Sequence, residues 1–234
     1  VQVDNDLFQS VKDIEILDAI APLNYEQEKS RFFESKFSVN PNFSYGRHEI
    51  DLFRKKRDLY SIPIDKIIDE DLRFLYSEVV ESYIDKLDQY KSIGSPDFLY
   101  DSLRYYGEPS DKDLSNAKFI LHLPDDFEDD RGAMLSSAEI VNQLESFAKT
   151  HGYDYDLKIV DNMIANAMVS GKTVKVNKKA VVPQIEVTAL AHHELGVHLL
   201  TTLNARRQPL KILSLGCPVN TTTQEGIAIL CEYL

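Results

Sequence analysis

The chain has 234 residues, 43% of them hydrophobic and 27% charged, which is typical of a globular protein with a sizeable core. Its formal net charge of −12 argues against nucleic acid as a partner, because phosphates are bound by Lys and Arg. No apolar run is long enough to span a membrane, and the N-terminus lacks the order of a signal peptide. The only cysteines, Cys217 and Cys231, make no disulfide framework, so a reducing, cytoplasmic location is expected.

Helical periodicity dominates the first part of the chain. Apolar residues from Leu7 to Leu17 recur at spacings of three and four, which predicts an amphipathic helix that Pro22 ends. Asn24 is a candidate N-cap for a second helix, and Gln27 three residues later is typical of a capping box. Further helices and a connecting loop are predicted: helices at 50–59, 69–90 and 98–106, and the loop at 41–45.

Short strands are expected once the pattern changes near residue 118. Runs at 118–123 and 157–160 are compatible with strands. Segments 167–169 and 173–176 flank a Ser-Gly-Lys turn, which predicts a β-hairpin.

Three more helices are predicted around and after these strands. One begins after Ser136, where Glu139 completes the signature of a capping box, and it extends to Thr150. A second is expected at 184–204. A third, at 224–234, has no Gly, Asn or Pro to close it, which predicts that the sequence is C-terminally truncated.

These elements predict an α+β fold that is predominantly helical. We expect a helical N-terminal part at 1–115. A catalytic part at 116–234 is expected to carry a small sheet or hairpin next to the helix that holds the motif described below. The sequence contains no internal repeat.

Three of the six histidines fall within seven positions: His192, His193 and His198. The zinc-hydrolase signature His-Glu-x-x-His places two ligands four residues apart on one helix face. His193 and His198 are separated by one residue more than the histidines of that signature. Side chains five positions apart point about 140° away from each other around the axis of a regular α-helix. A π-type turn would bring both rings to one side, and Gly196 inside the interval tolerates such an irregularity. If the two histidines share an ion, the helix between them must therefore be distorted.

A purely structural role competes with metal binding, because paired histidines on helices often only satisfy hydrogen bonds. A catalytic zinc site needs a third protein ligand and leaves the fourth position to water. Glu225, on a helix that begins near Thr221–Thr223, can face the histidines if the two helices pack antiparallel. Alternatively, Glu225 is an acid stabilised by the positive N-terminus of its helix.

The pairing of the segment His193–His198 (His-Glu-Leu-Gly-Val-His) with Gln224–Ala228 (Gln-Glu-Gly-Ile-Ala) resembles the QEGLA-motif proteins. These are bacterial relatives of the microtubule-associated tyrosine carboxypeptidases, a zincin-like family with the lengthened His-Glu-x-x-x-His motif. Ile227 stands where the family motif has Leu, which leaves Glu225 untouched. Further segments also resemble the family, over nearly the whole chain: Pro22-Leu23-Asn24, Arg31-Phe32-Phe33, 41–45, the hairpin at 167–176, Asn204, Gln208-Pro209 and Leu215-Gly216.

The resemblance implies that zinc is bound by His193, His198 and Glu225. It implies that Glu194 is the general base and then the general acid. Glu194 adjoins a ligand and cannot easily bind the same ion, which agrees with a role in proton transfer. His192 is interpreted as a core histidine or as one that supports a ligand, because the site already has three protein ligands.

Motif and resemblance together predict a zinc-dependent metallopeptidase of carboxypeptidase type, in which Glu194 activates a zinc-bound water. Its substrate is expected to be the C-terminus of a peptide or protein. Two alternatives remain open: a regulatory or binding protein that keeps the metal site without catalysis, and a zinc hydrolase of non-peptide amides or esters.

The remaining sequence patterns give weaker evidence of function than the histidine motif does. The acidic run at 125–130 lacks the order of a calcium loop and is interpreted as a solvated turn. Segment 170–173 echoes the end of a phosphate-binding loop but lacks its leading glycine. Arg206, Arg207 and Lys211 can receive a substrate carboxylate, although solvated surface charge explains each of them as well.

Overall fold

The computed structural model describes residues 1–14, 16–17, 19–46, 50–123, 132–161, 163–216 and 218–233, with the backbone alone at 218 and 219. Its elements follow one another in this order: α1 (Gln2–Val11), α2 (Tyr25–Glu34), α3 (Leu52–Tyr60), η1 (Ile64–Lys66), α4 (Glu70–Ser92), α5 (Phe98–Tyr106), α6 (Asp111–Ile120), β1 (Met134–Ser136), α7 (Ser137–His151), β2 (Asp156–Val160), β3 (Ala167–Ser170), β4 (Thr173–Asn177), β5 (Val181–Pro183), α8 (Gln184–Leu190), η2 (Ala191–Leu199), α9 (Leu200–Ala205), η3 (Lys211–Ser214) and α10 (Pro218–Glu232). The expected α+β, predominantly helical fold is confirmed.

The strands form two small sheets. In the three-stranded sheet the order is β2-β4-β3, with β2 parallel and β3 antiparallel to β4, so the predicted hairpin is confirmed. Gly171 in the hairpin turn has a φ of +60°, which favours glycine. Strands β1 and β5 pair separately as an antiparallel ribbon.

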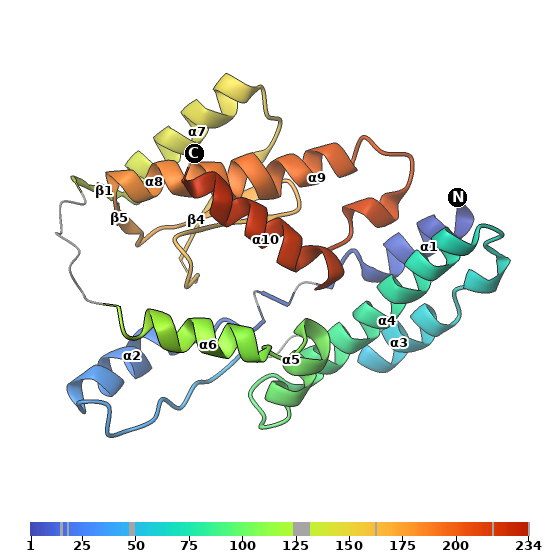
Figure 1. Ribbon diagram of the computed structural model, residues 1–234, viewed down its shortest axis with the longest axis horizontal. Coiled ribbons are helices and arrows are strands. Elements are labelled where there is room, and N and C mark those ends of the chain that lie inside the picture. The colour runs from blue at the N-terminus through green and yellow to red at the C-terminus, as the bar shows by residue number, and fades with distance from the viewer. Residues whose placement is uncertain are drawn as a thin grey trace.

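Two main hydrophobic cores hold the fold together. The first lies between α1, α3 and α4, and Ile212 and Leu215 from the C-terminal part of the chain also pack into it. The second lies between α7, the β-hairpin and the continuous helix α8–η2–α9, and includes Leu195 and Leu199. Figure 1 shows α1, α3 and α4 lying together, with α7 to α9 grouped apart from them. The second core therefore fixes the helix that carries the histidine motif against the sheet.

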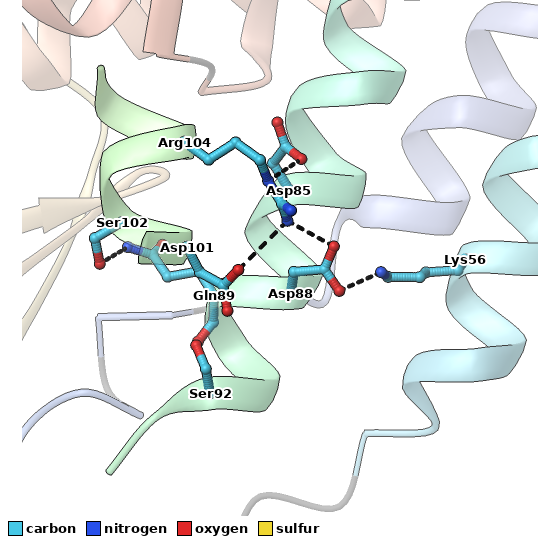
Figure 2. Close-up of polar contacts among 8 residues, drawn as sticks. All are labelled: Lys56, Asp85, Asp88, Gln89, Ser92, Asp101, Ser102 and Arg104. Carbon is cyan, nitrogen blue, oxygen red and sulfur yellow. Dashed lines mark hydrogen bonds and ion pairs between the residues drawn. The ribbon is translucent and has the colours of Figure 1, made fainter. Parts of the chain in front are cut away.

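A network of charged side chains ties α5 and α3 to α4 (Figure 2). The Arg104 guanidinium on α5 contacts Asp85 at 2.8 Å and Asp88 at 2.7 Å, both on α4. Asp88 is also paired with Lys56 of α3. Burial acts to raise the pKa of Asp88, but the hydrogen bonds and charges of Lys56 and Arg104 outweigh it and hold that pKa below its ordinary value. The network joins three helices through one shared carboxylate.

Most predicted helices are present, and several are nearly as long as expected. The capping box of Ser136 and Glu139 forms at the start of α7, with 2.8 Å from the Ser136 amide to the Glu139 carboxylate. Helices α3, α4 and α5 lie within two residues of the bounds predicted for them, whereas α10 begins at Pro218, earlier than predicted. None of the described helices is long and apolar enough to cross a bilayer.

Some expectations were wrong. The first helix ends at Val11 rather than near Pro22. Asn24 is the N-cap residue of α2, as predicted, but its side chain makes no capping bond and instead bonds the loop at Asn42 and Ser44. That loop, at 41–45, is irregular as predicted.

The strand expected at 118–123 is also wrong, since α6 extends to Ile120 and the next three residues form a turn and a bend. Ser110 and Asp113 form a capping box that starts α6, and this local signal outweighs the strand preference of Phe119 and Ile120. Helix α6 continues past residue 115, and the division of the chain at 115/116 stays a prediction. The acidic run at 125–130 lies outside the described residues.

Candidate metal centre

The histidine motif lies inside one long helix whose middle section is π-helical. The π segment, η2, extends from Ala191 to Leu199 and is flanked by the α-helical α8 and α9. The predicted distortion between His193 and His198 is therefore confirmed. The wider turn puts both imidazoles on one side, with their ring centroids 4.8 Å apart.

Steric crowding does not explain why the π segment has a glycine at position 196. A Cβ at this position would meet Phe147 Cζ at 3.8 Å and the Ala191 carbonyl oxygen at 3.9 Å, which are ordinary van der Waals distances. Its contribution is the weak helix preference of glycine, which lowers the cost of leaving the regular α-helix.

Helix α10 brings the third candidate ligand to the histidines. It packs on η2 and runs back across it in the opposite direction (Figure 1). The Glu225 carboxylate lies 3.6 Å from His193 Nε2 and 3.6 Å from His198 Nε2. One possible ligand atom from each of the three residues lies within 4.8 Å of the others.

The alternative explanation of Glu225, as an acid at a helix N-terminus, does not fit its position. Helix α10 begins at Pro218, so Glu225 lies in the third turn, and the first turn holds no acidic residue. The favourable effect of a helix N-terminus on an acid falls off within the first turn. The contacts of Glu225 with the two imidazoles are therefore its main interactions in the described structure.

Glu194 contacts the three-stranded sheet and also interacts electrostatically with His193 and Glu225. It is buried, and its carboxylate accepts a hydrogen bond of 3.0 Å from the Val169 amide of β3. Burial raises the pKa of Glu194 to about 7, against the opposing effects of His193 and of the Val169 hydrogen bond. Glu194 thus stands beside the candidate ligands with a high affinity for a proton.

The two histidines differ in their further partners. His193 Nδ1 lies 2.6 Å from the Glu232 carboxylate, also on α10. His198 is bonded by the Gln224 side chain, and burial lowers its pKa although the Glu225 charge opposes this. A lowered pKa favours the neutral imidazole, the form that binds metals. Glu232 was missed by sequence reasoning, because it belongs to no motif and lies 39 residues from His193.

His192 stands outside the cluster, as expected. Its ring meets Phe147 of α7 edge-on, with centroids 5.1 Å apart, in the core beneath the motif helix. Among the described residues, the group with metal-binding geometry consists of His193, His198 and Glu225.

A cleft of about 550 Å³ opens beside the centre. It lies between the motif helix, the segment 213–216 and α10, and it includes Gln224, which bonds His198. Its lining consists of apolar, hydroxyl and amide side chains without a charged residue. Of the cationic candidates between the ligand segments, Arg206 and Arg207 are exposed, and Lys211 lies over the Phe8 ring at 5.3 Å.

The family model described as microtubule-associated tyrosine carboxypeptidase matches residues 30–234. The chain belongs to this family. Its match includes both ligand segments and all of the described sheets, while Pro22-Leu23-Asn24 lies before it. Among the curated proteins, no match to the chain is found. Membership in the tyrosine carboxypeptidase family implies a carboxypeptidase-like peptidase function, with a peptide or protein as substrate.

Proposed function

We propose that the protein is a zinc-dependent metallopeptidase of carboxypeptidase type. The observation that carries the proposal is the convergence of His193, His198 and Glu225, with Glu194 next to them.

The donor set fits zinc. Two imidazole nitrogens and one carboxylate oxygen are a known ligand set of catalytic zinc sites, which keep a fourth position for water. Two donors at about 2.0–2.1 Å from one tetrahedral ion stand roughly 3.3 Å apart. The observed 3.6 Å distances, from one Glu225 oxygen to His193 Nε2 and from the other to His198 Nε2, are a few tenths of an ångström longer than that value. Calcium and magnesium would instead favour a set made of oxygen atoms.

The centre is open to substrate on the side of Glu225. The side chain of Glu225 is 47% exposed, whereas those of His193 and His198 are 18% and 16% exposed. A zinc ion held there would acidify a water molecule and polarise a substrate carbonyl. Glu194, fixed by the Val169 amide of β3, would accept the proton of that water and donate it to the leaving amine.

The uncharged cleft next to Gln224 offers space for one substrate side chain. Because no charged side chain lines it, a charged substrate residue would lose its hydration there without a compensating partner. We therefore expect uncharged residues to be preferred at the position that enters the cleft.

The proposal is tested with zinc-loaded protein and a library of peptides that differ at the C-terminus, analysed by mass spectrometry. The expected result is stepwise loss of C-terminal residues, abolished by a chelator and restored by zinc. A zinc-loaded protein that cleaves none of the peptides would instead support the non-catalytic alternative. Cleavage confined to simple esters or amides would support the non-peptide hydrolase.

A further inference from the structure

The His193 ring lies between two carboxylates of the same helix. Its Nε2 faces Glu225 at 3.6 Å, and its Nδ1 lies 2.6 Å from Glu232. Glu225 and Glu232 are seven residues apart on α10, which is about two helical turns, so both project from one face of the helix. A single helix therefore supplies the partner of each ring nitrogen.

We propose that Glu232 is a positioning residue that orients His193 for metal binding. The inference rests on the proposed function, because such orientation matters only if His193 binds an ion through Nε2. Nδ1 donates its proton to the Glu232 carboxylate, which leaves the Nε2 lone pair free and directed toward Glu225 and His198. The carboxylate also makes the imidazole a more basic ligand.

The two candidate histidine ligands are supported unequally. His198 has the neutral side chain of Gln224 as its further partner, whereas His193 has a carboxylate. Both histidines lie within the π segment, where the backbone departs from the regular helix. The carboxylate of Glu232 on a neighbouring helix gives His193 the stronger, charge-assisted hydrogen bond of the two.

An ordinary surface ion pair is the competing explanation. The Glu232 side chain is 35% exposed, and exposed pairs contribute little to stability. The two explanations differ in what the loss of Glu232 changes. If the contact is only an ion pair, loss of Glu232 changes the melting temperature alone. If Glu232 positions His193, its loss changes the zinc affinity and the tautomer of His193.

The test compares zinc affinity in wild type, Glu232→Gln and Glu232→Ala, measured by competition with a chromophoric chelator. We expect about 10–100-fold weaker binding in Glu232→Ala, the usual effect of losing a carboxylate that supports a ligand. Glu232→Gln keeps the shape and a neutral acceptor, and its loss should be smaller. Leu230→Ala, an exposed position on the same helix, serves as the matched control and should bind zinc like wild type.

The second readout is the tautomer of His193 in the metal-free proteins, taken from nitrogen-15 shifts of the neutral ring. Wild type should carry its proton on Nδ1, where Glu232 accepts it, and Glu232→Ala should shift the proton toward Nε2. Unchanged zinc affinity and tautomer in Glu232→Ala would overturn the positioning role while leaving the metal site intact. If wild type itself binds no zinc, the proposed function fails and the positioning role fails with it.

Discussion

Glu194 and His193 are neighbours in the sequence, yet their side chains meet different parts of the fold. The carboxylate of Glu194 is held by the Val169 amide of β3, and the imidazole of His193 faces α10. In the proposed function, the motif therefore supplies one residue as a ligand of the ion and the next residue for proton transfer. Burial is the main reason that the pKa of Glu194 rises to about 7, which suits a group that must both take and return a proton near neutral pH.

Glu194→Gln should separate these two roles. The substitution keeps the shape of the side chain and removes its ability to accept a proton. We expect hydrolysis to fall by about 10²–10⁴-fold or more, with zinc content unchanged. Turnover of a cleaved peptide and metal analysis of the same sample check both parts. Loss of zinc together with activity would show that Glu194 is a ligand and that the roles assigned above are wrong.

The π segment is the element on which the centre depends. Its presence was predictable because five-residue spacing on a regular α-helix would point the two rings apart. The sequence alone does not show whether the distorted helix requires a glycine at position 196. The atoms around Gly196 leave room for a Cβ. The second hydrophobic core, which holds Leu195 and Leu199, thus has a larger part in fixing the helix than the glycine does.

Gly196→Ala should therefore be tolerated. Alanine removes backbone entropy from the unfolded chain and is preferred to glycine by about 1 kcal/mol within helices. We expect stability to be unchanged or slightly higher, and zinc affinity to remain within a few-fold of wild type. Chemical denaturation and zinc competition are the measurements. A tenfold or greater loss of affinity would mean that the π turn needs the conformational freedom of glycine.

A buried carboxylate connects the first helix to the segment that precedes α10. Asp4 of α1 accepts hydrogen bonds from the Lys211 and Ile212 amides, at 2.9 Å each, and from the Tyr76 hydroxyl at 2.7 Å. Burial alone would raise the pKa of Asp4, but these three hydrogen bonds outweigh it and lower the pKa. Sequence could not reveal the contact with Lys211 and Ile212, because these residues lie more than 200 positions from Asp4.

Asp4→Asn should destabilise the protein in a pH-dependent way. Because the pKa of folded Asp4 is below 3.8, its contribution to stability is complete above that value and is lost as pH falls through the lowered pKa. We expect a loss of about 1–3 kcal/mol near neutral pH, as for hydrogen bonds to a charged group. The difference from wild type should shrink below pH 3.8. Urea denaturation at several pH values measures it, and a difference that is constant with pH would contradict the assignment.

Structural features set by residues close together in the sequence could be predicted, whereas contacts between distant segments could not. Helix α5, the capping box of α7 and the β3–β4 hairpin follow from short patterns of capping, turn and apolar residues. The candidate ligands could be named because they lie in two recognisable segments. The interaction of Glu232 with His193 depends on how α10 crosses the motif helix (Figure 1), which no local pattern encodes.

The two cores are linked through the segment between the candidate ligands. Residues 210–215 pack into the core of α1, α3 and α4, while the helices on either side of this segment form the centre. The helical N-terminal part thus holds the connection between His198 and Glu225 in place. We therefore expect the proposed zinc affinity to depend on the assembled fold, because a ligand set held loosely by its surroundings loses affinity.

A calorimetric zinc titration tests whether His193, His198 and Glu225 together bind one zinc ion. We expect one zinc per chain, with binding strongly weakened by alanine at each of the three positions and retained in Glu194→Gln. Circular dichroism of every variant verifies that the fold is kept. Absence of zinc binding by the wild-type protein, or binding that survives all three alanine substitutions, would contradict the account.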